Sequence, residues 1–189
     1  MARPLSDLKR EAILDAAARL VAEQGVGAST AQIARAAKVA EGTLFIYFDN
    51  KDALLNALFV KLETRLSQTI AEGYPADGDA RSQLLHIWNT LIAWGAAQPL
   101  ERKALKQLKV SQRIASCTRD QCSALFADVL SRLQASLQAY VAPDRLSFYM
   151  EHVFIGLFET TLDAIAAQPA RRDEFGQAAF DLFWRGIQR

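Results

Sequence analysis

The fold of the N-terminal region is decided by residues 29–48, which read STAQIARAAKVAEGTLFIYF. Ser29 followed by Gln32 fits a capping box, in which the serine caps a helix and the glutamine reaches back to it. We therefore expect a helix that begins at Ser29, a short turn at 38–40, and a second helix over 41–48. Two short helices joined by about three residues are the signature of a helix-turn-helix.

The second of these helices divides into an inner and an outer face. Leu44 and Phe48 lie four residues apart, so both are expected to pack inward. Phe45, Ile46 and Tyr47 then face outward at least in part. Large apolar side chains that contact only water are unfavourable, so this face is expected to meet a partner. In a helix-turn-helix the second helix lies in the major groove, which makes double-stranded DNA the expected partner.

Helical periodicity continues along the rest of the chain. Apolar residues recur at three- and four-residue spacing, and no segment alternates as a strand would. The pattern predicts an all-α protein of about nine helices. A helix-turn-helix domain is expected at residues 1–52 and a larger helical domain at 53–189. The expected helices cover 6–24, 29–37, 41–48, 52–72, 80–97, 100–115, 118–141, 144–167 and 171–187.

The motif and its flanks closely resemble the DNA-binding signature of the TetR family of bacterial regulators. The resemblance covers 29–55 and extends upstream through 13–25, with many positions matching in order and spacing. Three departures occur in the motif: Lys38 stands where glycine is usual, Ala40 where serine is usual, and Phe45 where tyrosine is usual. The last two remove hydroxyl groups that family members commonly offer to DNA.

The resemblance implies two sets of DNA-binding residues. One set positions the phosphate backbone, and the other faces the groove. Glu41 is the odd member, because phosphates repel it; it either accepts a hydrogen bond from a cytosine amino group or only caps the helix. The phosphate set is Thr30, Thr43, Tyr47 and Lys51, with Lys38 supplying charge; the groove set is Ala40, Glu41, Gly42, Phe45 and Ile46.

The outer face of the helix at 41–48 lacks Arg, Asn and Gln, the side chains that make bidentate base contacts. We therefore predict that base recognition depends on apolar contact with thymine methyl groups and on DNA shape. Charge would come from Lys38 and from a tail with Arg3, Lys9 and Arg10. Residues 1–52 are nevertheless neutral, because seven basic residues (3, 9, 10, 19, 35, 38, 51) meet seven acidic ones (7, 11, 15, 23, 41, 49, 52).

The larger domain is expected to dimerise through its last two helices. The segment 144–167 is apolar on most sides, and a helix of that kind is buried on two faces. The last helix carries an apolar stripe with small residues. A self-complementary four-helix interface, as in family dimers, is one interpretation, and ordinary core within one chain is the other. The expected interface residues are Phe154, Leu162, Phe175, Ala179, Leu182, Phe183 and Gly186.

The resemblance also implies that the larger domain binds a small-molecule effector. Its aromatic content predicts an apolar or aromatic effector, although each aromatic alone is more often core than pocket. The candidates are His86, Trp88, Trp94, Arg113, Phe126, Tyr149, His152 and Phe158. A basic stripe on the helix at 100–115 is interpreted as a solvated face or, less favoured, an anion site. It consists of Arg102, Lys106, Lys109 and Arg113.

Other function classes find little support in the sequence. His86 and His152 lack metal-ligand spacing, and neither a phosphate-binding loop nor a nucleophile motif is present, so we expect no enzyme, metal or cofactor. Cys117 and Cys122 fit small semi-buried residues better than a redox sensor. No segment has the length of a membrane span or of a signal peptide, which predicts a cytoplasmic protein. A helical protein-interaction module without DNA binding is the main alternative, because residues 1–52 are neutral.

Overall fold

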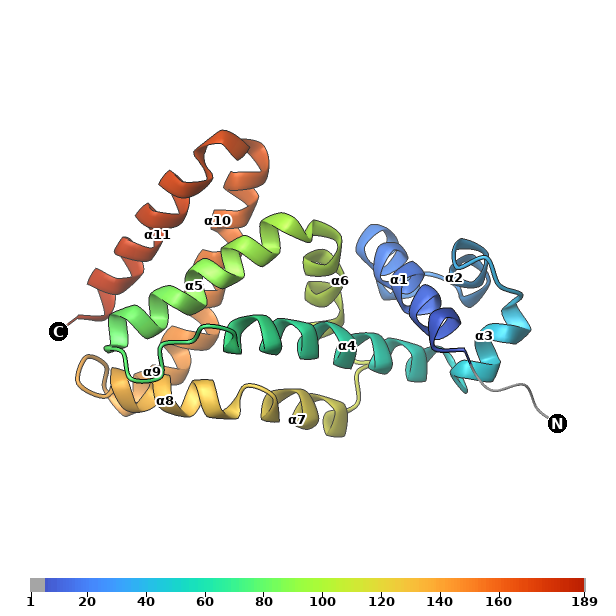
Figure 1. Ribbon diagram of the computed structural model, residues 1–189, viewed down its shortest axis with the longest axis horizontal. Coiled ribbons are helices and arrows are strands. Elements are labelled where there is room, and N and C mark those ends of the chain that lie inside the picture. The colour runs from blue at the N-terminus through green and yellow to red at the C-terminus, as the bar shows by residue number, and fades with distance from the viewer. Residues whose placement is uncertain (1–5, 189) are drawn as a thin grey trace. The chain divides into compact units, whose positions relative to one another are not determined.

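The computed structural model describes residues 6–188, which are predominantly helical and contain no strand, so the all-α prediction is confirmed (Figure 1). Short 3-10 turns at Gly25–Gly27 and Pro169–Arg171 and a π-helical segment at Phe148–Phe154 accompany the α-helices. The α-helices are α1 (Asp7–Gln24), α2 (Thr30–Ala36), α3 (Glu41–Tyr47), α4 (Lys51–Ala71), α5 (Ala80–Ala97), α6 (Pro99–Lys109), α7 (Ser116–Ala124), α8 (Ala127–Leu137), α9 (Pro143–Ser147), α10 (Ile155–Ala167) and α11 (Arg172–Ile187).

The helices form two compact units. The first combines the described residues up to 65 with 98–125, and the second combines 66–97 with 126–188. Helix α4 runs through the division, and α6 and α7 belong to the unit of the helix-turn-helix. These two units do not coincide with the expected domains at 1–52 and 53–189. The boundary at residue 52 marks only the expected end of the DNA-binding module, and it stays a prediction.

The first unit is organised around α1. Gly25 follows this helix with φ 75°, a conformation that glycine adopts without strain. The apolar face of α1, including Ile13, Leu14 and Val21, is buried. Helix α1 packs extensively on α6 and also contacts α2 (Figure 1). The helix-turn-helix is thus held on a core that includes a helix about 60 residues further along the chain.

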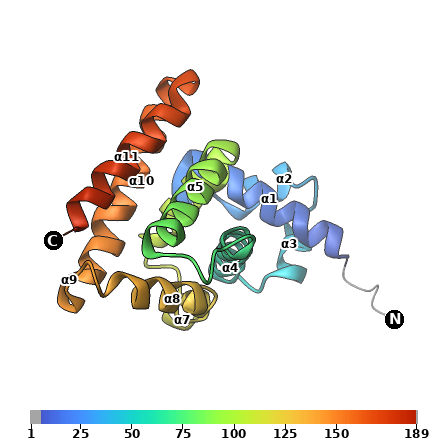
Figure 2. The same cartoon turned by 60° about the vertical axis from the view of Figure 1, so that its left-hand side comes forward.

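The second unit is organised around Trp88 of α5. The Trp88 ring is fully buried and packs edge-on against Phe154, with ring centroids 5.3 Å apart. Its indole N–H donates to the carbonyl oxygen of Gly176 at 2.9 Å, which satisfies the one polar group of the side chain. Helices α10 and α11 lie side by side (Figures 1 and 2), and both also contact α5.

Three expected helices differ from the structure. The helix predicted at 118–141 is interrupted after α7, where the Leu125 N–H bonds the Cys122 carbonyl three residues back and α8 begins anew at 127. The helix predicted at 100–115 ends at Lys109, because Ser111 accepts from the Arg113 N–H in a turn. The helix predicted at 144–167 is divided in the structure into α9, the π-helical segment and α10, which follow one another without a gap in the chain.

Candidate nucleic-acid interface

The two helices of the motif form as the sequence predicts. The Ser29 side chain accepts from the Gln32 N–H at 3.2 Å, and the Gln32 side chain accepts from the Ser29 N–H at 3.0 Å, so the capping box is confirmed. Leu44 and Phe48 are both buried, as expected for the inner face of α3. Local signals therefore set the geometry of the helix pair.

The turn between α2 and α3 is left-handed at Lys38, whose φ is 57°. This is the position where the family signature usually has glycine. A Cβ atom in this conformation meets its own backbone, which costs roughly 1–2 kcal/mol. The Lys38 side chain is exposed and can reach a phosphate. Compared with glycine, lysine at this position places a positive charge beside the expected DNA interface and makes the folded protein somewhat less stable.

Replacing Lys38 by glycine is expected to raise the free energy of unfolding by roughly 0.5–1 kcal/mol, because the strain disappears while the backbone loses more entropy. Lys38→Ala removes the same charge and keeps the strained conformation, so it serves as the matched control without a gain in stability. Urea denaturation measures both. On DNA, each variant should lower the slope of log affinity against log salt by about one. Equal stability of the two variants would contradict the strain.

The outer face of α3 presents apolar surface to solvent. Phe45 is 44% exposed and Ile46 is 66% exposed. Gly42 is exposed as well, and a Cβ placed on it would meet no other atom within 4 Å. The smooth surface at Gly42 leaves room for a close approach by another backbone. This face is therefore open to a partner along its length.

Thr30 and Glu41 are joined by a hydrogen bond that the sequence did not reveal. The Thr30 hydroxyl donates to Oε1 of Glu41 at 2.7 Å, which ties the start of α2 to the start of α3. Thr30 was expected to position a phosphate, and in this structure its hydroxyl is already used. The hydrogen bond thus fixes the side chains of Thr30 and Glu41 relative to each other.

Tyr47 connects α3 to the start of α1. Its hydroxyl oxygen accepts from the Ser6 N–H at 3.0 Å, and the phenol can still donate its own hydrogen to a phosphate. Nearby, the Arg10 guanidinium lies 5.4 Å from the centroid of the Phe48 ring. Arg3, which was expected to contribute charge from the tail, lies outside the described residues.

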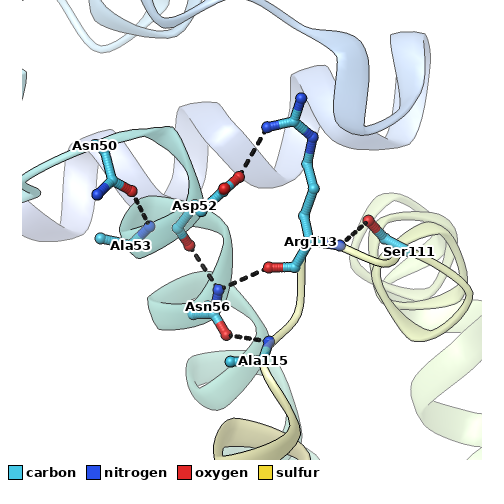
Figure 3. Close-up of polar contacts among 7 residues, drawn as sticks. All are labelled: Asn50, Asp52, Ala53, Asn56, Ser111, Arg113 and Ala115. Carbon is cyan, nitrogen blue, oxygen red and sulfur yellow. Dashed lines mark hydrogen bonds and ion pairs between the residues drawn. The ribbon is translucent and has the colours of Figure 1, made fainter.

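Lys51 begins α4 and lies near both Arg113 and Asp52. Burial lowers the pKa of Lys51, the nearby Arg113 guanidinium lowers it further, and Asp52 acts in the opposite direction. Arg113 itself pairs with Asp52 at 2.8 Å (Figure 3). A phosphate group placed here would offset the repulsion between the two cations. The role of Lys51 in positioning a phosphate stays a prediction.

Asn56 holds the loop after α6 on the first turns of α4. Its side-chain amide donates to the carbonyl oxygens of Asp52 at 2.7 Å and Arg113 at 3.0 Å, and its oxygen accepts from the Ala115 N–H at 3.0 Å (Figure 3). Asn50 caps the same helix by accepting from the Ala53 N–H at 2.8 Å. Sequence reasoning missed Asn56, although an asparagine inside a helix is a signal for a backbone partner.

The residues expected to bind the effector are placed in different surroundings. Trp88 and Phe158 are buried in the core of the second unit, and their role in effector binding stays a prediction. Arg113 lies in the first unit, where it pairs with Asp52. Three of the candidates are half-buried and one is exposed: Trp94, Phe126 and His86 in the first group, and His152 in the second. The Nε2 atom of His86 lies 2.9 Å from the carbonyl oxygen of Ile70. Tyr149 lines a cavity of about 230 Å³, with Tyr140, Val141, Ala142, Arg145, Gly186, Ile187 and Gln188.

The residues expected at the dimer interface divide into buried and accessible sets. Phe154, Leu162 and Phe183 are buried within their own chain, and Phe154 and Phe183 pack edge-on at 5.1 Å. These three are core, because no surface remains for a partner. Leu182 is 67% exposed, Gly186 is exposed, and Phe175 and Ala179 are half-buried. An open apolar groove is lined by Leu157, Thr160, Thr161, Ala164, Phe175, Ala178, Ala179 and Leu182.

The basic stripe expected at 100–115 does not form one solvated face. Arg102 is buried, and Lys109 pairs with the buried carboxylate of Glu63 at 3.1 Å. Arg113 lies beyond the end of α6. Cys122 is buried in the same unit, where burial and Glu63 raise the pKa of its thiol to about 11 against the effect of Lys109. Such a thiol is protonated and unreactive at neutral pH.

Comparison with known proteins agrees with the family resemblance of the helix-turn-helix motif. Residues 13–58 match the family described as bacterial regulatory proteins, tetR family. An uncharacterized HTH-type transcriptional regulator of Haemophilus influenzae is 25% identical in an alignment of 187 positions that covers 95% of this chain and 95% of that one. The crystal structure of a TetR family transcription regulator from Shewanella sp. PV-4 is 28% identical, with a TM-score of 0.82 over 96% of this chain and 98% of that one.

The fold is shared with more distant structures. The regulator FadR of Bacillus subtilis in complex with stearoyl-CoA has a TM-score of 0.67 at 19% identity, over 92% of this chain and 96% of that one. Among the described residues, none of the helices combines the length and apolar character that a membrane crossing requires. Residues 13–58 thus carry the DNA-binding module of the tetR family of bacterial regulatory proteins, and over its whole length the chain is similar to TetR family transcription regulators.

Proposed function

We propose that this regulator is a cytoplasmic repressor that binds a near-palindromic operator as a homodimer and is released by a small, largely apolar effector. The exposed apolar face of α3, with Phe45 and Ile46 in solvent, is the observation that carries DNA binding. Around this face, Thr43, Tyr47 and Lys51 offer hydrogen-bond donors to phosphates. Base recognition then combines apolar contact with thymine methyl groups and DNA shape.

The dimer is proposed to form through the open groove between α10 and α11. Phe175, Ala179, Leu182 and Gly186 are the residues of the predicted interface that keep accessible surface. A twofold dimer places two recognition helices about one DNA turn, or a multiple of a turn, apart. This spacing is what makes a near-palindromic operator the expected target.

The effector is proposed to act by a shift between two states of the dimer. An effector that binds better to the free dimer than to the DNA-bound dimer lowers the affinity for DNA by the ratio of its two affinities. The second unit is proposed to contain the effector site, and the cavity that Tyr149 lines is one candidate for it. The stearoyl-CoA complex of a regulator with this fold supports a ligand site in this type of architecture.

Titration of the purified protein with duplexes from its own promoter region tests the proposal. We expect nanomolar affinity for one of these duplexes, weaker binding to unrelated duplexes, and affinity that falls as salt rises. Affinity independent of both sequence and salt would overturn it. That outcome favours the alternative of a protein-interaction module, which the neutral charge of residues 1–52 supports.

A further inference from the structure

The recognition helix carries one exposed hydrogen-bonding side chain. All residues of α3 are described, and of its exposed members Gly42, Phe45 and Ile46 have no polar side-chain atom. Thr43 and Tyr47 are half-buried, and the Tyr47 hydroxyl already accepts from Ser6. Glu41 is therefore the exposed side chain of α3 that can make a polar contact with a base edge.

The Glu41 carboxylate is held in place. The Thr30 hydroxyl donates to Oε1 at 2.7 Å, across the turn between the two helices. An ionised carboxylate has two oxygens with about four acceptor sites, so the bond to Thr30 leaves Oε2 available. A fixed side chain loses less entropy when it binds than a mobile one. Thr30 thus prepares Glu41 for a contact.

A carboxylate at a DNA interface is unfavourable unless a donor lies opposite it, because the surrounding phosphates are negative. In the major groove, the donors on base edges are the N4 amino group of cytosine and the N6 amino group of adenine. The adenine donor lies beside the N7 acceptor, which a carboxylate cannot use. Cytosine is therefore the base that matches an acceptor-only side chain.

We propose that Glu41, positioned by Thr30, recognises the amino group of a cytosine in each half-site of the operator. The inference rests on the proposed function, because it assigns one base within the site that α3 reads. Glu41 and Phe45 are one helical turn apart, about 6 Å along the axis, or roughly two base-pair steps. A thymine that contacts Phe45 is accordingly expected within about two base pairs of the cytosine.

Selection of bound duplexes from a random-sequence library tests the assignment with four proteins. The wild type should select cytosine at one position of each half-site. Glu41→Gln keeps the shape of the side chain and adds donors that fit adenine, so it should lose the cytosine preference by about tenfold to 100-fold and favour adenine there. Thr30→Val removes the hydroxyl at nearly constant shape and should weaken the preference, whereas Thr30→Ser should retain it.

A change in the DNA alone provides a second test that does not depend on the folding of variants. N4-methylcytosine at the assigned position places a methyl group on the amino nitrogen, and it should lower wild-type affinity by about tenfold or more. 5-Methylcytosine keeps the amino group and is the matched control, with a much smaller effect expected. Glu41→Gln should respond equally to the two modified bases.

Three results would overturn the assignment. A selected motif without a fixed cytosine would do so while leaving the proposed function in place. A uniform gain in affinity of Glu41→Gln for all sequences, with no change in base preference, would show that Glu41 only repels phosphates. Failure of the wild type to select any motif would overturn the proposed function and the assignment together.

Discussion

Leu182→Glu is expected to convert the regulator to a monomer and to lower its affinity for an operator by at least about 100-fold. Leu182 is 67% exposed on α11 and borders the groove lined by Phe175 and Ala179. In a twofold interface each substitution occurs twice, so two unpaired carboxylates would be buried in apolar surroundings. A monomer also loses the gain of roughly 10²–10⁴ that comes from binding two half-sites at once.

Sedimentation analysis would measure the oligomeric state of Leu182→Glu, and titration with an operator duplex would measure its affinity. Leu130→Glu is the matched control, because Leu130 is also an exposed leucine of the second unit but lies on α8. The control should stay dimeric and bind normally. If Leu182→Glu sediments as a dimer, the groove between α10 and α11 is not the interface.

The parts of this structure that the sequence predicts well are those set by neighbouring residues. The capping box of Ser29 and Gln32 depends on four consecutive residues, and the inner positions Leu44 and Phe48 follow from the helical repeat. The conformation of Lys38 could be inferred only through the resemblance, since a lysine gives no local signal for a positive φ.

The parts that the sequence did not predict depend on pairs far apart in the chain. Asn56 meets Arg113 and Ala115 nearly 60 residues later, and no local pattern encodes that meeting. Periodicity shows that a face is buried but not against which partner. For that reason Phe154 and Phe183 were assigned to a dimer interface, while they pack against each other inside one chain.

Lys109→Met is expected to lower the free energy of unfolding by about 2–4 kcal/mol, the largest stability effect that we predict for a polar side chain. Glu63 of α4 is 4% exposed, and its Oε1 lies 3.1 Å from the Nζ of Lys109 on α6. Removing one partner of a buried ion pair leaves a desolvated charge without compensation. The Lys109 side chain is about half-exposed, so water reduces the cost below that of a fully buried pair.

The double variant Glu63→Gln with Lys109→Met separates this cause from a loss of packing. With the buried charge gone, the double variant should recover most of the stability, which urea denaturation measures for all three proteins. Lys103→Met, an exposed lysine of the same helix, should change stability by less than about 0.5 kcal/mol.

The thiol of Cys122 gives a second measure of the ion pair between Glu63 and Lys109, one that does not require unfolding of the protein. Because Lys109 lowers the pKa of the thiol, Lys109→Met should raise that pKa, which a spectroscopic titration of the Cys122 thiolate in a Cys117→Ser background measures. If Lys109→Met is as stable as the Lys103→Met control, then Glu63 does not need Lys109 as an ion-pair partner. Lys109 would then belong to the solvated basic face that the sequence suggested. If the double variant recovers, Lys109 serves to join α6 to α4 beneath the DNA-binding module, and an anionic ligand is not needed to explain it.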